Sequence, residues 1–189
     1  MRLEFVRSSP DLASLPASRA EVAVVGRSNV GKSSLINALG GSKALAKVSK
    51  TPGRTQLLNV FSLGDGTTLV DCPGYGYASA PRALVNSWQK MAEQYLVGRD
   101  ELVMILVLVD GEIGPTKLDL QMFDWLEAND LPYAIVATKH DKVKASAREK
   151  RKRELAERCG VERAQVTWVS AHKGTNIDRL RGLLTEWLA

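Results

Sequence analysis

Short apolar runs alternate along the chain with longer segments in which apolar residues recur at helical spacing. The runs with the length of strands are 21–25, 56–63, 67–72, 102–109, 133–138 and 165–170. The segments with the length and spacing of helices are 32–40, 82–97, 116–129, 146–159 and 176–188. This alternation is typical of an α/β fold with a mostly parallel sheet. We therefore predict three layers, with helices on both faces of a six-stranded sheet in which a hairpin at 64–66 contributes one antiparallel strand.

The chain has 189 residues, which suits one domain with a full core. Residues 21–189 carry the alternating pattern and are expected to form that single domain. Residues 1–20, which include Pro10 and Pro16, are expected to form an N-terminal arm, either ordered or frayed. The polar stretch 41–54 has no clear period and is expected to be a long loop. Loops of that length inside a compact domain tend to be functional.

A phosphate-binding loop lies between the first expected strand and the first expected helix. Residues 26–33 read Gly-Arg-Ser-Asn-Val-Gly-Lys-Ser, a complete G-x-x-x-x-G-K-S motif in a strand–loop–helix context. In such a loop successive backbone N–H groups face phosphate oxygens, and the helix N-terminus adds a favourable dipole. Lys32 is expected to reach the β- and γ-phosphates, and the Ser33 hydroxyl is expected to bind Mg²⁺. The residues assigned to nucleotide binding here are Gly26, Arg27, Ser28, Asn29, Val30, Gly31, Lys32, Ser33 and Ser34.

A second motif follows another expected strand and has the form Asp-x-x-Gly. It consists of Asp71, Cys72, Pro73 and Gly74, all of which we assign to nucleotide binding. Asp71 is placed to hold Mg²⁺ through water, and the Gly74 N–H is placed to contact the γ-phosphate. Cys72 is expected to be a small buried residue and not a nucleophile.

Two further strand ends carry candidate base-recognition residues. Thr138, Lys139, His140 and Asp141 fit the [Asn/Thr]-Lys-x-Asp signature, in which the carboxylate accepts two hydrogen bonds from guanine and the lysine lies along the base. Adenine lacks both donors in that arrangement, so such a site discriminates between the two bases by several kcal/mol. The last expected strand ends at Val169, Ser170 and Ala171, where a backbone N–H would meet the guanine O6. Because open α/β sheets bind ligands outside the carboxyl ends of their strands, the order of these motifs predicts a Ras-like P-loop domain that binds GTP.

The long loop holds the candidate second hydroxyl ligand of Mg²⁺. It contains Thr-Pro-Gly-Arg-Thr-Gln at 51–56, just before the hairpin strand. We choose Thr55 as the ligand, with Thr51 as the alternative, and assign Gly53 and Arg54 to the same nucleotide-binding segment. Ordering such a loop by the γ-phosphate and Mg²⁺, and releasing it on hydrolysis, is the usual switch of this class. The predicted metal site is Ser33, Thr55 and Asp71, and the predicted catalytic residues are Lys32, Thr55 and Gly74.

The whole chain resembles the EngB family of bacterial GTPases, also called YihA or YsxC, which belongs with TrmE, Era, EngA and the septins. The resemblance is carried by Phe5-Val6-Arg7-Ser8-Ser9-Pro10-Asp11-Leu12, GRSNVGKSSLIN from Gly26, TPGRTQ from Thr51, DCPGYGYA from Asp71 and TKHDK from Thr138. It implies a role in large ribosomal subunit assembly and normal cell division, with the GTP-bound protein binding rRNA or ribosomal proteins of that particle. His140 is a small departure, since a smaller residue is more usual there, and it leaves the guanine contacts in place.

The predicted catalytic machinery has a gap. Many GTPases carry a glutamine directly after Asp-x-x-Gly to orient the attacking water, and Tyr75 stands there in this chain. We therefore expect slow intrinsic hydrolysis that a partner or an ion completes. In related GTPases an asparagine at the position of Asn29 helps to bind K⁺, which gives the hypothesis of K⁺ activation. The alternative role of Asn29 is a loop-capping hydrogen bond.

The charge and the composition limit the kinds of partner and the compartment that we expect. The net charge is +5, and the stretch from Lys139 to Arg153 is strongly basic. Such a run is either a solvated helix face or a contact surface for the phosphate backbone of RNA. The longest apolar run, 102–109, is far short of a membrane span, no signal peptide is visible, and Cys72 and Cys159 form no disulfide or metal pattern. We therefore expect a cytoplasmic monomer that does not bind membranes.

Two functions from different classes fit these residues. The first is a GTP-hydrolysing switch that acts on a maturing ribosomal subunit, and the complete Mg²⁺ set favours it. The second is a GTP-dependent binding module with negligible turnover, which the missing glutamine favours. A P-loop kinase would leave the guanine signature from Thr138 to Asp141 unexplained.

Overall fold

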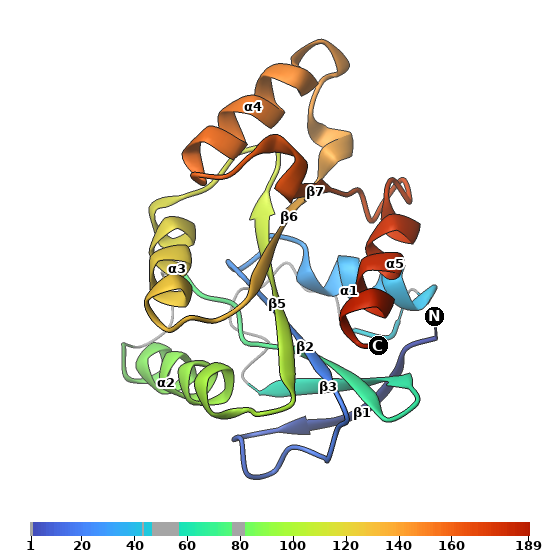
Figure 1. The fold of residues 1–189 in the computed structure, drawn as a ribbon. Coiled ribbons are helices and arrows are strands. Elements are labelled where there is room, and N and C mark those ends of the chain that lie inside the picture. The colour runs from blue at the N-terminus through green and yellow to red at the C-terminus, as the bar shows by residue number, and fades with distance from the viewer. Residues whose placement is uncertain (1, 43, 47–56, 77–81) are drawn as a thin grey trace.

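The computed structural model describes residues 2–42, 44–46, 57–76 and 82–189, with the backbone alone for 82–89. The strands are β1 (Glu4–Ser9), β2 (Glu21–Gly26), β3 (Leu58–Gly64), β4 (Thr67–Asp71), β5 (Leu102–Asp110), β6 (Tyr133–Thr138) and β7 (Val166–Trp168). The α-helices are α1 (Lys32–Gly40), α2 (Arg82–Gly98), α3 (Lys117–Ala128), α4 (Arg148–Arg158) and α5 (Ile177–Trp187). Figure 1 shows the helices on both sides of one twisted sheet. The predicted α/β class with three layers is confirmed.

The described strands form one sheet in the order β1-β3-β4-β2-β5-β6-β7. β3 is antiparallel to both of its neighbours, and every other described pairing is parallel. β3 is therefore the one strand of the described sheet that runs against the rest, as predicted from the hairpin. Asp65 and Gly66 turn this hairpin with φ of 50° and 73°, a left-handed geometry that short polar residues and glycine adopt most easily.

The sheet has seven strands, so the predicted count of six is wrong. The additional strand is β1, which lies within the expected arm and pairs with β3 at the edge of the sheet. Phe5 meets Phe61 edge-on with ring centroids 5.8 Å apart, and the Ser8 hydroxyl donates to Asn59 Oδ1 at 2.6 Å. Phe5 and Val6 remain about half exposed, because an edge strand buries little of its surface. Backbone pairing, which leaves no hydrophobic pattern in a sequence, thus holds this segment.

Two apolar cores lie on the two faces of the sheet. Along the central strand β5, Ile105, Val107 and Val109 belong to one core, and Leu106 and Leu108 belong to the other. This alternation follows from the two-residue period of a strand and explains why the run is apolar throughout. Helices α1 and α5 cover one face, and α2, α3 and α4 cover the opposite face (Figure 1).

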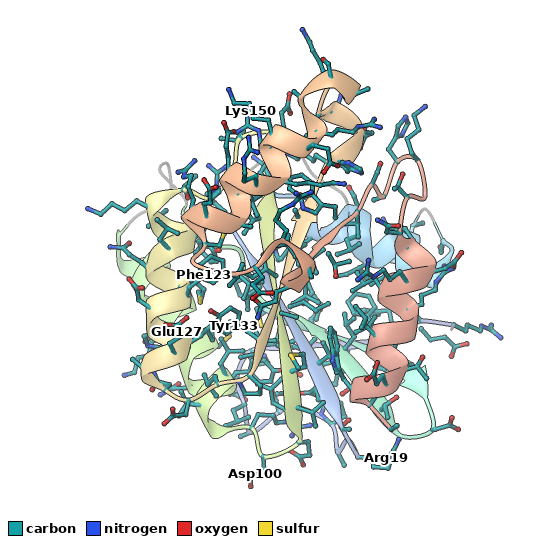
Figure 2. The ribbon with its side chains drawn as sticks, turned by 45° about the horizontal axis from the view of Figure 1, so that its top comes forward. Arg19, Asp100, Phe123, Glu127, Tyr133 and Lys150 are labelled. Carbon is teal, nitrogen blue, oxygen red and sulfur yellow. The ribbon has the colours of Figure 1, made fainter. Side chains whose placement is uncertain are left out.

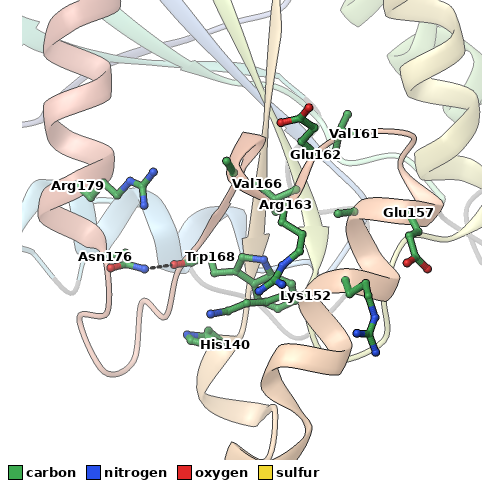
Figure 3. A pocket seen from close by; sticks show the side chains of 13 residues that line it. His140, Lys152, Glu157, Val161, Glu162, Arg163, Val166, Trp168, Asn176 and Arg179 are labelled. Atoms are coloured by element: carbon green, nitrogen blue, oxygen red, sulfur yellow. Dashed lines mark hydrogen bonds between the residues drawn. The ribbon is translucent and has the colours of Figure 1, made fainter.

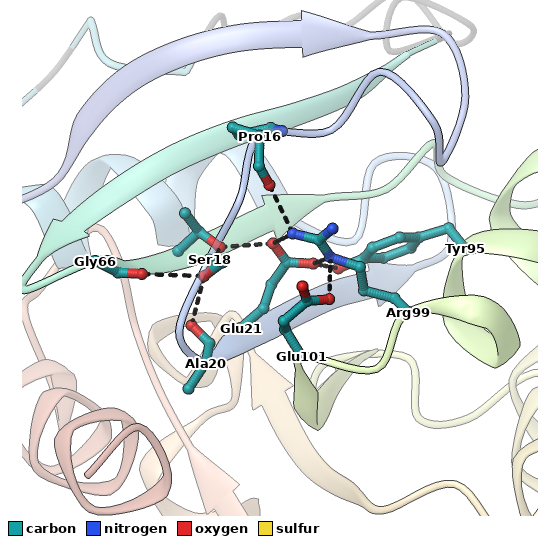
Figure 4. A network of polar contacts seen from close by, with 9 residues as sticks. Pro16, Ser18, Ala20, Glu21, Gly66, Tyr95, Arg99 and Glu101 are labelled. Atoms are coloured by element: carbon teal, nitrogen blue, oxygen red, sulfur yellow. Dashed lines mark hydrogen bonds and ion pairs between the residues drawn. The ribbon is translucent and has the colours of Figure 1, made fainter.

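A buried polar network closes the end of the sheet at which β2 begins (Figure 4). Glu21 is fully buried, and its carboxylate accepts hydrogen bonds from Thr68 Oγ1 at 2.6 Å, Tyr95 Oη at 2.8 Å and Arg99 Nε at 3.2 Å. Arg99 also donates to the Pro16 carbonyl oxygen at 2.7 Å. Because each oxygen of the buried carboxylate has a partner, the charge is compensated. The network fixes the start of β2, and the phosphate loop follows the opposite end of this strand.

Most expected elements have their predicted type, and the differences lie at their ends. The last strand was expected over 165–170, but β7 covers only Val166–Trp168. The basic helix was expected from residue 146, but α4 begins at Arg148 after a turn of 3₁₀-helix at Ala145–Ala147. None of the described helices is long and apolar enough to cross a membrane.

Candidate functional site

The predicted site residues that the structure describes lie at the carboxyl ends of β2, β4, β6 and β7. These four strands are parallel, so the loops that follow them emerge at the same edge of the sheet. In Figure 2 this edge lies toward Lys150, while Arg19 and Asp100 mark the opposite end of the molecule.

The phosphate loop follows β2 directly and leads into α1. Asn29 and Gly31 have φ of 62° and 109°, so the chain turns through the left-handed region twice within three residues. Gly31 is also the N-cap of α1, whose first residue is Lys32. The orphan N–H groups of the first helical turn therefore lie at the loop, which is the arrangement that binds phosphate. The Asn29 side chain forms no hydrogen bond with the residues that the structure describes, so its capping alternative has no partner there.

Lys32 and Asp71 form a buried ion pair between the phosphate loop and the end of β4. Lys32 Nζ lies 3.6 Å from Asp71 Oδ1, and Asp71 is 2% exposed. Burial raises the pKa of Asp71, and the charge of Lys32 opposes that shift. Among the described residues no donor makes a hydrogen bond to Asp71 Oδ1. The Lys32 ammonium group therefore lies beside a carboxylate oxygen of Asp71 that can still accept a hydrogen bond.

Two backbone hydrogen bonds hold the loop after β4 against the phosphate loop. Ser28 N donates to the Tyr75 carbonyl oxygen at 2.9 Å, and Tyr75 N donates to the Gly26 carbonyl oxygen at 3.3 Å. A Cβ atom on Gly74 would lie 3.3 Å from both the Gly26 carbonyl oxygen and Ser28 N. A glycine at 74 therefore permits a close approach of the two backbones. Pro73 and Cys72 are buried, and burial raises the pKa of the Cys72 thiol, which agrees with a packing role.

The Tyr75 hydroxyl is engaged in a hydrogen bond with Asp119 and is not placed for proton transfer. Tyr75 Oη donates to Asp119 Oδ1 at 2.8 Å, and Asp119 Oδ2 accepts from the backbone N and the hydroxyl of Thr116 at 2.7 and 2.8 Å. Burial raises the pKa of Tyr75 above its usual range, and the Asp119 charge adds to the shift. The position that holds glutamine in many GTPases thus anchors the loop to the N-terminus of α3.

The base-side loop after β6 contacts the phosphate loop directly. The Thr138 hydroxyl donates to the Val30 carbonyl oxygen at 2.6 Å and lies 3.2 Å from the Val109 carbonyl oxygen. Lys139 adopts φ of 55°, and its Nζ pairs with Asp110 Oδ2 at 2.6 Å. The lysine expected along the base is therefore paired with the last residue of β5.

Asp141 faces the loop after β7. Ser170 Oγ donates to Asp141 Oδ1 at 2.6 Å, and this hydrogen bond is the main reason why the pKa of Asp141 is lowered. The hydroxyl of Ser170 also accepts from Lys173 N at 3.0 Å. His140 N donates to the Val169 carbonyl oxygen at 3.1 Å, which ties the two base-side loops together. The carboxylate is ionised at neutral pH and able to accept hydrogen bonds.

The structure brings together the predicted residues of 26–34, 71–74, 138–141 and 169–171. Gly53, Arg54, Thr55 and the alternative Thr51 lie outside the described residues. Sequence reasoning missed Asp110 and Asp119. Asp110 ends the central strand at the carboxyl edge, a position that could have marked it. Asp119 stands three residues after Thr116 in a capping-box spacing, a signal for the start of α3 but not for the bond to Tyr75.

Comparisons with known proteins show which family the chain belongs to. A family model described as 50S ribosome-binding GTPase matches residues 21–139. A probable GTP-binding protein EngB of Vibrio vulnificus (strain YJ016) is 44% identical over 189 residues, covering 98% of this chain and 87% of the relative. A crystal structure of a probable GTP-binding protein engB has 25% identity and a TM-score of 0.73, over 89% of this chain and 98% of that chain. The crystal structure of Era in complex with MgGDPNP and nucleotides 1506–1542 of 16S ribosomal RNA has 26% identity and a TM-score of 0.71, over 91% of this chain and 57% of that chain.

Proposed function

Because this chain belongs to the EngB family of P-loop GTPases, we propose that it is a Mg²⁺-dependent switch that binds the large ribosomal subunit or its precursor during assembly. Family membership makes it a GTP-binding protein and a GTPase. The metal, the roles of single residues and the ribosomal step are the proposed parts. The nucleotide site is supported by the bond from the Thr138 hydroxyl to the Val30 carbonyl oxygen, which joins the base-side loop to the phosphate loop. The ribosomal part is supported by the match to the family model described as 50S ribosome-binding GTPase.

The proposed nucleotide site has a phosphate side and a base side. The N–H groups of residues 26–34 hold the phosphates, with Lys32 leaving Asp71 to reach the β- and γ-phosphates. Asp141 accepts two hydrogen bonds from guanine, and the backbone at 169–171 donates to the guanine O6. Lys139 leaves Asp110 to lie along the base. The depressed pKa of Asp141 supports this role, because only the ionised carboxylate accepts both bonds.

The residues present fit a magnesium ion. Mg²⁺ prefers oxygen ligands and is usually held by one or two protein groups together with phosphate oxygens and water. The Ser33 hydroxyl and Asp71, through a water molecule, are the proposed protein contacts, and Thr55 adds a hydroxyl in the GTP-bound state. The buried Asp71 Oδ1, which accepts no hydrogen bond from the described residues, supports this assignment. When bound, the ion neutralises charge on the β- and γ-phosphate oxygens.

The proposed catalytic contacts are Lys32, Thr55 and the Gly74 N–H. Tyr75 is engaged with Asp119, so we expect slow intrinsic turnover. K⁺ near Asn29 would offset charge on the reacting phosphates, as an arginine finger does in other GTPases. Phosphate release in KCl and in NaCl at equal ionic strength tests this part. We expect faster release in KCl and loss of the difference in Asn29→Ala, whereas equal rates in both salts would refute it.

Sedimentation tests the ribosomal part. We expect the protein to pellet with large ribosomal subunits in the presence of a non-hydrolysable GTP analogue, and to remain in the supernatant with GDP or no nucleotide. Small subunits serve as the control particle. Failure to pellet in every nucleotide state would leave a GTPase of this family whose partner is not the large subunit.

The bond between Tyr75 and Asp119 also favours a second candidate function. A GTP-dependent binding module with negligible turnover would need no group that orients water. Multiple-turnover phosphate release, measured with and without large subunits, separates the two functions. Release stimulated by subunits supports the switch, and fewer than one phosphate per protein molecule in both conditions supports the module.

A further inference from the structure

A basic groove lies on the outer side of the base-side loops, between α4, the segment that leads into β7, and the start of α5 (Figure 3). Its volume is about 810 Å³, within the range of pockets that hold small organic ligands. Lys152 and Arg153 of α4, Arg163 before β7 and Arg179 of α5 contribute its positive charge. Of the predicted nucleotide-binding residues that the structure describes, His140 alone lines it.

The positive charge of the groove is only partly compensated. Lys152 and Arg163 both pair with Glu149, Lys152 at 3.0 Å. Arg153 and Arg179 have no ion-pair or hydrogen-bond partner in the part of the chain that the structure describes, and both are exposed. Two guanidinium groups from different helices therefore border one groove with their donors free. Guanidinium groups are well suited to phosphate because their donors match two of its oxygens at once.

The floor of the groove combines apolar surface with unused polar atoms. Ala156, Val166 and Trp168 are buried there, Trp168 at 5% exposure. Trp168 Nε1 and His140 Nε2 are buried without a hydrogen-bond partner among the described residues. Buried polar atoms of this kind are uncommon, because each forgoes a bond it would have in water. Such a floor can bind a ligand by apolar contact and hydrogen bonds in addition to charge attraction.

We propose that this groove binds one unpaired nucleotide of an RNA strand, with the base on the apolar floor and the flanking phosphates on Arg153 and Arg179. The inference rests on the proposed function, since the RNA would belong to the ribosomal particle. Single-stranded segments are the usual targets of specific RNA recognition, because their bases can be splayed out into pockets. Glu157 and Glu162 also line the groove and can accept hydrogen bonds from base amino groups, which an acidic peptide does not offer.

The indole N–H signal of Trp168 in ¹⁵N-resolved NMR spectra tests the site directly. The protein is saturated with Mg²⁺ and GDP so that RNA cannot enter the guanine site, and Trp168→Phe identifies the signal. The probes are hexaribonucleotides without terminal phosphates, a blunt RNA duplex of equal charge, and poly-glutamate. We expect a saturable shift of the Trp168 signal with single-stranded RNA only. An unmoved signal, or an equal shift with poly-glutamate, would overturn the proposal.

Two charge-matched variant pairs test the phosphate contacts. Arg153→Gln with Arg179→Gln removes the two free guanidinium groups, and Lys144→Gln with Lys150→Gln removes two exposed cations beside and on α4 that do not line the groove. We expect the first pair to bind RNA about tenfold more weakly, with the slope of log K against log salt reduced by about 1.4, that is, 0.7 for each of two contacts. The second pair should bind within about twofold of the parent protein. Equal losses in both pairs would show diffuse attraction by a basic surface and would refute the groove.

Sedimentation separates this inference from the function on which it rests. If the parent protein pellets with large subunits but single-stranded RNA does not shift its Trp168 signal, the groove proposal fails and the ribosomal function stands. If the signal moves and the arginine pair loses RNA, the groove stands even where the parent protein does not pellet. The two failures therefore give different results.

Discussion

Replacing Thr138 with valine removes one hydroxyl group and almost no volume. The residue is 4% exposed, and its hydroxyl donates to the Val30 carbonyl oxygen at 2.6 Å. This bond joins the end of β6 to the phosphate loop across 108 positions in the sequence. The substitution therefore removes a contact between the two sides of the proposed nucleotide site, together with the 3.2 Å approach of the same hydroxyl to the Val109 carbonyl oxygen.

The expected cost follows from the burial of this contact. Losing a buried hydrogen bond and leaving its carbonyl oxygen unpaired costs about 1–3 kcal/mol. In a domain of this size each kcal/mol corresponds to about 2–4 °C in Tm, so a loss of about 2 kcal/mol lowers Tm by roughly 4–8 °C. Because the phosphate loop loses a restraint, we also expect GDP affinity to fall about tenfold, which corresponds to about 1.4 kcal/mol.

Thermal unfolding followed by circular dichroism measures the first effect, and titration with GDP measures the second. Thr138→Ser keeps the hydroxyl and should retain GDP affinity. Thr185→Val is the matched control, because its hydroxyl bonds to the Arg181 carbonyl oxygen on an exposed helix surface. If Thr138→Val melts and binds GDP like the parent protein, the bond does not couple the two loops and the reasoning fails.

Two other predictions concern parts of the molecule away from the phosphates. Glu21→Gln removes a buried charge that faces Arg99, so the free energy of unfolding, measured in urea, should fall by about 3–5 kcal/mol. The affinity for GDP should be unchanged, because Glu21 lies at the opposite end of the sheet from the candidate site. Weaker GDP binding would contradict this separation of the two ends. Burial, with the charges of Arg148 and Lys152, lowers the pKa of His140 from its ordinary value of 6.5. The unfolded chain therefore takes up this proton at a higher pH than the folded chain, and stability should fall as the pH drops through about 6.5. His140→Gln should flatten this part of the stability profile, and a profile that is unchanged in this variant would show that His140 is not its source.

The nucleotide motifs could be predicted from the sequence because each is short and follows its own strand. The phosphate loop at 26–33 and the base-side residues 138–141 need only a strand before them and a parallel sheet to bring them together. The apolar run 102–109 supplied that sheet, since a strand buried on both faces implies helices on both sides. Local patterns were therefore enough to predict where the candidate site lies.

Contacts between distant segments could not be predicted in this way. β1 joins the sheet through backbone bonds to β3, and its exposed Phe5 and Val6 show no alternation that marks an edge strand. The ion pair of Lys139 with Asp110 and the bond of Tyr75 to Asp119 depend on side chains that meet only after the sheet is assembled. The groove beside α4 combines residues from four segments, namely the loop after β6, α4, the segment that leads into β7 and the start of α5. A basic run in the sequence could therefore not distinguish it from a solvated helix face.

The identity of the bound base tests the central claim most directly. We would measure the affinities of GDP, ADP and xanthosine diphosphate for the parent protein and for Asp141→Asn by calorimetry. In the parent protein GDP should bind far more tightly than ADP or xanthosine diphosphate. The variant should lose about 100-fold in GDP affinity and gain affinity for xanthosine diphosphate, because an amide can donate to the oxygen that replaces the guanine amine. Equal binding of ADP and GDP, or an unchanged GDP affinity in Asp141→Asn, would contradict the assignment of these loops to a guanine nucleotide.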